Sequence, residues 1–270
     1  MVTLSRISVY PIKALDPVEL DSVAITAVGG LSGDRIYAIV DENGNYVNGK
    51  RTAKVHRLDA TVDLETNHLT LRKRGGDTTR KFHLDRDRDQ LDTWLSNYFG
   101  IDVHLERGPG GSQTDSVVLG DSSEPGPTLI SEATLREVAS WYDGIDAEEM
   151  RLRLRPNLVV TDVPAFWEDK LVTRDGRRFR IGDTTLEGVK PVPRCVVPTR
   201  HPDTGETYDG FRETFVRRRR ESLPEWTSPE LFDGDLFSLM ALTRVPQEQR
   251  AGTLAVGDSL ELVDAAVDGV

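Results

Sequence analysis

Short runs of alternating or continuous apolar residues dominate the first hundred positions and predict β-strands. The runs stop at turn-forming residues, and Asp41-Glu42-Asn43-Gly44 predicts a hairpin. One segment, Asp87–Tyr98, instead repeats apolar residues at helical spacing, and Gly100 would end it. The strands predicted in this half are Leu4–Tyr10, Val18–Thr26, Ile36–Val40, Leu58–Leu64, Leu69–Arg74 and Lys81–Leu84.

A stretch rich in glycine, proline and polar residues, 109–127, predicts a linker or long surface loop. Helices are then expected from the N-cap Ser131 to Trp141, over Asp146–Leu154 and over Asp209–Arg220. The strands predicted in the second half are Thr128–Ile130, Leu158–Thr161, Arg178–Ile181, Thr184–Val189, Cys195–Thr199, Leu236–Val245 and Ser259–Val263.

The order of these elements predicts the fold class. Strands do not alternate regularly with long helices, which argues against a doubly wound sheet. We expect a mainly β architecture, built from β-barrels with a few peripheral helices. Two domains are predicted, an N-terminal β-barrel over residues 1–108 and a C-terminal barrel over 128–265, joined by 109–127.

Charge and composition limit the surroundings of the protein. The net charge of -11 disfavours nucleic acid, and an acidic surface with 7 lysines among 34 basic residues is typical of a salt-loving prokaryote. The helical run Arg217–Arg220 lies beside glutamates and indicates a solvated, ion-paired face. No signal peptide and no apolar run of about 20 residues occur, so we expect a cytoplasmic protein without membrane contact.

Several common catalytic motifs are absent from the sequence. It has no dinucleotide-binding glycine motif, no P-loop and no nucleophile elbow. The 5 histidines lack the spacing of a zinc enzyme. These absences argue against serine hydrolases and zinc hydrolases.

The single cysteine, Cys195, is the main candidate for chemistry. A lone cysteine forms no intramolecular disulfide, which agrees with a reducing compartment, and it is most often a small buried apolar residue. Here Arg194 precedes it and Pro193 and Pro198 stiffen the segment. A neighbouring cation favours the thiolate, which acts as a nucleophile or a soft metal ligand.

Cationic side chains near other strand ends add to this signal. Arg155 and Asn157 flank Pro156, which excludes the right-handed helical region for Arg155 and predicts an extended backbone there. Such cations can clamp a phosphate and donate to a heterocycle, although each alone also fits a surface ion pair. The other candidates are Lys13, Arg35, Lys50 and Arg51.

At this point the sequence resembles the MOSC domain family together with its N-terminal β-barrel. The resemblance covers nearly the whole chain and rests on several short motifs in the family's order. These are Tyr10-Pro11-Ile12-Lys13, Gly30–Arg35, Ser131–Thr134, Leu154–Val160, Ala165–Asp169, Arg194-Cys195-Val196, Pro202–Gly205 and Gly252–Asp258.

The resemblance implies a molybdenum cofactor, with Cys195 as both catalytic residue and metal ligand. Residues implied to contact the pterin or its phosphate are Lys13, Arg35, Arg51, Ser131, Arg155, Asn157 and Arg194. Glu168, Asp169 and Thr199 would lie next to these contact residues and help to position them. The chain departs from many reductase members at Ala14 and Pro193, where those members carry serine.

The resemblance further implies an oxidoreductase that reduces small N-hydroxylated compounds. With no flavin, haem or iron–sulfur motif in the chain, electrons would come from a ferredoxin-like or cytochrome-type donor. One alternative is a sulfur carrier with a persulfide on Cys195, which would receive sulfur from a separate pyridoxal-phosphate sulfurase. Another is a cofactor-binding module without catalysis.

Overall fold

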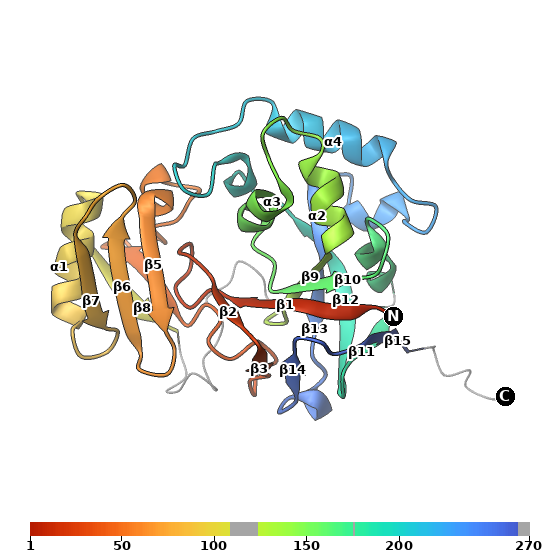
Figure 1. Cartoon of the computed structure of the whole chain (residues 1–270), viewed down its shortest axis with the longest axis horizontal. Coiled ribbons are helices and arrows are strands. Elements are labelled where there is room, and N and C mark those ends of the chain that lie inside the picture. The colour runs from red at the N-terminus through yellow and green to blue at the C-terminus, as the bar shows by residue number, and fades with distance from the viewer. Residues whose placement is uncertain (109–123, 175, 264–270) are drawn as a thin grey trace.

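The computed structural model describes residues 1–108, 124–174 and 176–263. It is mainly β-sheet with four α-helices, which confirms the predicted fold class (Figure 1). Most of the linker predicted over 109–127 lies outside the described residues.

The largest sheet has eight strands in the order β15-β11-β12-β13-β9-β10-β1-β2. Neighbouring strands in this sheet are antiparallel except β9 and β10, which pair in parallel. The bounds are β1 Thr3–Val9, β2 Val18–Leu20, β9 Thr128–Ser131, β10 Leu158–Thr161, β11 Arg178–Ile181, β12 Thr184–Pro193, β13 Ser238–Arg244 and β15 Leu260–Leu262.

Backbone hydrogen bonds close this sheet on itself. Leu4 N donates to Asp258 O at 2.8 Å, and Leu260 N donates to Val2 O at 2.8 Å. On one edge β1 pairs with β10; on the other edge its start meets the last strand and its end pairs with β2. Closure removes the exposed edges that an open sheet would leave and produces a barrel.

Three smaller sheets accompany the large one in the described residues, two within the N-terminal half and one that joins the two halves. β4 (Tyr37–Asp41) pairs with β8 (Val103–Arg107), and β3 (Ser22–Ala24) pairs with β14 (Thr253–Ala255). A three-stranded sheet contains β5 Leu58–Asp63, β6 His68–Lys73 and β7 Thr79–His83.

Four α-helices cover these sheets. Helix α1 packs with β8 and the N-terminal sheets, whereas α2, α3 and α4 lie together on one side of β9 and β10 (Figure 1). Ser131 caps α2 as predicted, and Gly100 ends α1 with a φ of 76°. Their bounds are α1 Arg88–Phe99, α2 Glu132–Ala139, α3 Ala147–Leu154 and α4 Phe211–Glu221.

Some predicted elements differ from the structure. The strand expected over Val18–Thr26 is broken into β2 and β3, because its two ends pair with different strands. The strand expected over Cys195–Thr199 is wrong: Val197–Thr199 forms a short 3-10 helix, whose Pro198 cannot donate to a sheet ladder. Strand β8 was not predicted, although Val103-His104-Leu105-Glu106 alternates between apolar and polar residues.

The hydrophobic cores do not divide simply at residue 108. Residues 36–105 supply most of one core, in which Tyr37, Leu69 and Leu95 are buried. The first strands belong to another core, in which Leu4 and Ile7 pack with Leu158 and other residues of the C-terminal barrel. The division into two domains at 108 therefore stays a prediction, since β1 completes the C-terminal barrel.

Candidate active site

Cys195 lines a cavity of about 770 Å³ between the N-terminal and C-terminal parts of the chain. Its side chain is partly buried and forms no disulfide. The cavity size is that of a small-molecule or cofactor site. Cys195 is therefore not the enclosed apolar residue that lone cysteines most often are.

Tyr10 organises the cations of this cavity. Its ring is buried, with Arg155 Cζ 4.0 Å and Arg35 Cζ 5.4 Å from the ring centroid. The Tyr10 hydroxyl donates to Pro156 O at 3.1 Å, and burial raises its pKa, so it stays neutral. Cation–π contacts hold both guanidinium groups beside one ring.

Arg155 reaches this place through an unexpected backbone conformation. Its φ of 57° and ψ of 52° are left-handed, and its N–H caps α3 by donating to Arg151 O. The predicted extended backbone is wrong; Pro156 does exclude the right-handed helical region, but the helix ends through a left-handed residue instead. Arg155 Nη2 then donates to Leu15 O at 2.6 Å, and burial lowers its pKa.

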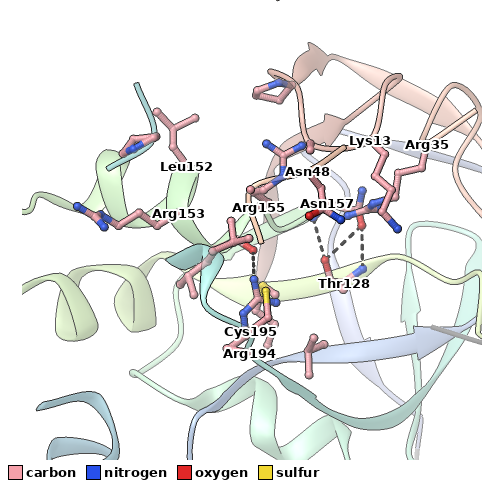
Figure 2. Close-up of a pocket in the computed structure, with 18 of the residues that line it drawn as sticks. Lys13, Arg35, Asn48, Thr128, Leu152, Arg153, Arg155, Asn157, Arg194 and Cys195 are labelled. Carbon is pink, nitrogen blue, oxygen red and sulfur yellow. Dashed lines mark hydrogen bonds between the residues drawn. The ribbon is translucent and has the colours of Figure 1, made fainter. Parts of the chain in front are cut away.

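Arg194 follows β12 directly and precedes Cys195. Its N–H donates to Phe237 O at 2.8 Å and its Nη2 donates to Leu154 O at 2.8 Å. Burial lowers the pKa of Arg194 to about 10, and the guanidinium is still charged at neutral pH because this pKa lies well above 7. Its Nε is buried without a hydrogen-bond partner among the described residues. Figure 2 shows Arg194 and Cys195 on one segment and Lys13 and Arg35 on two other segments of the N-terminal half.

Asn157 also lines the cavity, but its amide is engaged by the protein. Its Oδ1 accepts hydrogen bonds from Thr128 N and Oγ1, both at 3.2 Å (Figure 2). Its Nδ2 donates to Ser8 O at 3.1 Å. These bonds join β1, β9 and the start of β10. The geometry therefore favours a positioning role for Asn157 over a contact with a ligand.

Two predicted contact residues lie outside the cavity lining. Arg51 Nη1 instead donates to Asp41 at 2.8 Å, and hydrogen bonds from Asn45 and Arg51 lower the pKa of Asp41 to about 2. Ser131 is fully buried, and its Oγ accepts from Thr134 N at the start of α2. In both cases a local partner already uses the side chain.

Glu168 and Asp169 lie in a separate buried cluster. Asp169 forms an ion pair and a hydrogen bond with Arg219 of α4, and it accepts from Thr227 at 2.8 Å. Glu168 accepts from Thr134 at 3.0 Å, and burial together with Asp169 raises its pKa to about 7. Neither carboxylate lines the cavity around Cys195.

Thr199 is buried in the 3-10 helix that follows Cys195. Its Oγ1 donates to Val196 O at 2.8 Å, and its backbone O accepts from Tyr208 N at 2.8 Å. Thr199 therefore shapes the segment after the cysteine and does not line the cavity.

The structure adds cavity residues that sequence patterns did not reveal. The additional polar residues include Asp16, Asn48, His56, Arg74, Arg153, Lys190, Arg200 and Asp203. Lys50, by contrast, is a candidate from the sequence because it is a cation directly after the hairpin turn, and it does line the cavity. Ala14 and Pro193, which replace frequent serines, line it too.

Positive charge dominates the cavity although the whole chain carries -11. Among the described residues, nine cationic side chains and three carboxylates line it. Buried polar groups normally have partners, yet Nε of both Arg194 and Arg200 has none in the part of the chain that the structure describes. Both observations point to an anionic ligand with hydrogen-bond acceptors.

The described residues hold no group of three or more histidine, cysteine or carboxylate side chains suited to a metal ion. Within the described ranges, no helix combines the length and apolar character that crossing a bilayer requires.

Comparison with known proteins shows the family. Residues 1–102 match the MOSC N-terminal beta barrel domain, and residues 128–261 match the MOSC domain. The chain therefore belongs to the MOSC domain proteins, as its sequence motifs predicted.

Its curated relatives include mitochondrial amidoxime-reducing components. The bovine component 2 (Bos taurus) is 29% identical over 95% of this chain and 82% of the relative. The human component 1 (Homo sapiens) is 25% identical over 97% of this chain and 83% of the relative. Their names place those proteins in mitochondria, and a cytoplasmic location stays a prediction for this chain.

Proposed function

We propose that this protein is a molybdenum-cofactor-dependent reductase of N-hydroxylated compounds. The observation that carries the proposal is a partly exposed cysteine in a strongly cationic cavity of an otherwise acidic chain. The names of its relatives support reduction of amidoximes, which are N-hydroxylated amidines.

The cavity fits the pterin and phosphate of this cofactor. Arg194 and Arg200 each offer a buried Nε without a partner, which suits an anion with several acceptor oxygens. Lys13, Arg35 and Arg155 add positive charge from separate segments. Cys195 would supply the thiolate ligand to the metal, and Arg194 directly precedes it in the chain.

When bound, the cofactor supplies a metal that accepts and returns two electrons. The overall reaction takes R–NHOH, two electrons and two protons to R–NH2 and water, so the N–O bond breaks and oxygen leaves as water. The residues of this chain bind and orient the reactants. The electrons would come from a separate donor protein, ferredoxin-like or cytochrome-type.

Metal analysis tests the proposal directly. We expect about one molybdenum per chain in the purified protein and almost none in Cys195→Ser, since a hydroxyl is a far weaker ligand for this metal. Val196→Ala, at the exposed neighbouring residue, is the matched control and should retain molybdenum. Full metal content in Cys195→Ser would contradict the ligand assignment.

Turnover separates the reductase from the alternatives. With an artificial electron donor, the wild-type protein should reduce benzamidoxime, and Cys195→Ser should not. A sulfur carrier would show no turnover but would gain the mass of one sulfur at Cys195 after incubation with a cysteine desulfurase. A cofactor-binding module would hold molybdenum and do neither.

A further inference from the structure

Arg74 lies where three segments of the cavity wall meet. Its Nη2 donates to both oxygens of Asp16, at 2.7 and 2.8 Å. Its Nε donates to His56 O at 3.0 Å and lies 3.3 Å from Asp203 Oδ1. Asp16, His56, Arg74 and Asp203 all line the cavity that contains Cys195. One guanidinium therefore joins parts of the wall that are far apart in sequence.

Asp203 belongs to residues 200–207, the segment that follows the cysteine. A bridge between Arg200 and Thr207 folds this segment back on itself. It rests on the N-terminal half, where Arg57 Nε donates to Thr204 O at 3.0 Å. Gly205 has a φ of +73°, and a Cβ there would lie 2.8 Å from Ala53 Cβ. The segment is thus closely packed on residues 53–57.

The position of Arg74 is set by its own backbone. Its N–H donates to Arg57 O at 2.9 Å, just after strand β6 and before a turn at Gly75 with a φ of +78°. Arg74 can therefore reach residues 200–207 from a fixed point of the N-terminal half.

The charge of Arg74 differs from that of the other cavity arginines. Two carboxylates, Asp16 and Asp203, compensate it, whereas Nε of Arg194 has no partner. Burial raises the pKa of Asp16, and the nearby guanidinium of Arg74 opposes this rise, which helps to keep the carboxylate ionised. Arg74 is consequently suited to holding the wall in place and poorly suited to binding an anion.

We propose that Arg74 is a positioning residue for substrate, which holds residues 200–207 against the N-terminal half and so sets the shape of the cavity beside Cys195. The substrate part of this inference rests on the proposed reductase function. Its structural part, the anchoring of residues 200–207, stands on the contacts alone.

Steady-state kinetics with benzamidoxime and an artificial donor test the substrate part. For Arg74→Gln we expect KM to rise about tenfold, with kcat within about twofold and molybdenum content unchanged, because binding is disturbed and the metal site is not. Arg74→Lys should recover most of the wild-type KM. Arg72→Gln is the matched control, since Arg72 pairs with Asp59 away from the cavity and should leave KM unchanged.

Hydrogen–deuterium exchange of the same purified proteins tests the structural part without using activity. Peptides covering residues 200–207 should exchange faster in Arg74→Gln than in the wild type and in Arg72→Gln. Asp203→Ala removes the carboxylate that Arg74 Nε contacts in this segment. It should show the same effect, and it replaces Arg74→Gln if that variant does not fold.

The outcomes are distinguishable. Unchanged exchange in residues 200–207 together with an unchanged KM would overturn the positioning role. In another outcome, the wild type holds no molybdenum and reduces no substrate, while residues 200–207 still exchange faster in Arg74→Gln. That result would support the anchoring by Arg74 and reject the reductase proposal. A parallel fall in kcat and molybdenum content in Arg74→Gln would also count against a role in substrate positioning.

Discussion

Two clusters of charged side chains in this molecule differ in how their charges are used. Around Cys195, cations from at least six segments line a cavity, and two arginine Nε atoms there have no partner within the described residues. Around Glu168, the charges of Asp169 and Arg219 neutralise each other inside the protein, and Arg219 is fully buried. Buried nitrogens without a partner among the described residues occur in both clusters, since Nε and Nη1 of Arg219 have none either. What separates the clusters is the cavity, which the first lines and the second does not. We therefore propose that the first receives a ligand, while the second joins α4 to the barrel.

The difference shows why charged residues near one another in a family motif need not share a task. Both clusters were predicted to belong to the site. Removing one partner of a buried ion pair is costly because the other charge stays buried without compensation. Cations that line a cavity remain available to a ligand. Variants in each cluster should therefore affect different measurements.

The largest stability effect is expected at Arg219. Arg219→Met leaves Asp169 buried without its counter-charge, and the free energy of unfolding should fall by about 3–5 kcal/mol. The double variant Arg219→Met with Asp169→Leu should lose clearly less. Arg218→Met, which affects an exposed pair 3.7 Å from Glu221, is the control and should cost less than about 1 kcal/mol. Urea denaturation measures all three; equal losses at positions 218 and 219 would break the comparison.

Glu168 should give the buried cluster a pH dependence. Its pKa rises from 4.5 when exposed to about 7 in the fold, so the folded state binds the proton more tightly. Its contribution is greatest below pH 4.5 and is lost as pH rises to about 7, by about 3 kcal/mol in all.

The measurement is the difference in unfolding free energy between the wild type and Glu168→Gln at each pH. Because glutamine does not titrate, this difference isolates Glu168 from the other carboxylates. The wild type should lose stability relative to the variant between pH 4.5 and 8. A difference that stays flat, or that rises with pH, would rule out the buried protonated carboxyl.

Arg194 should affect ligand retention more than stability. In Arg194→Gln, molybdenum should be lost about tenfold faster on dialysis, which corresponds to about 1.4 kcal/mol. The free energy of unfolding should change by about 1 kcal/mol, because one hydrogen bond to Leu154 is disturbed. Arg180→Gln, in an exposed pair with Glu261, is the control. Unchanged metal retention in Arg194→Gln would remove Arg194 from the cofactor site.

The smallest effect is expected at Ser131. Ser131→Ala removes the N-cap of α2 and should cost about 1 kcal/mol of stability while molybdenum content stays unchanged. Metal analysis beside thermal denaturation tests both statements. A marked loss of molybdenum with little change in stability would return Ser131 to the cofactor site predicted from the sequence.

Much of the fold could be predicted because it depends on local patterns. Alternation located β5 and β6 to within a residue or two, and the capping residues Ser131 and Gly100 located helix ends. Predictions became wrong where pairing over long distances decided the outcome, as in the split of Val18–Thr26 between two partner strands.

For the site, the sequence alone made Cys195 the main candidate, since a single cysteine beside an arginine is visible without a fold. It also supplied Lys13, Arg35, Arg155 and Arg194, all of which line the cavity. Only the tertiary structure decided which other charges face that cavity. Arg74 and Asp203 are 129 positions apart, and Asp169 finds Arg219 50 positions away, so neither pairing has a local signal. The physical reason is that ion pairing depends on distance in space, which strand order and barrel closure impose after the local elements have formed.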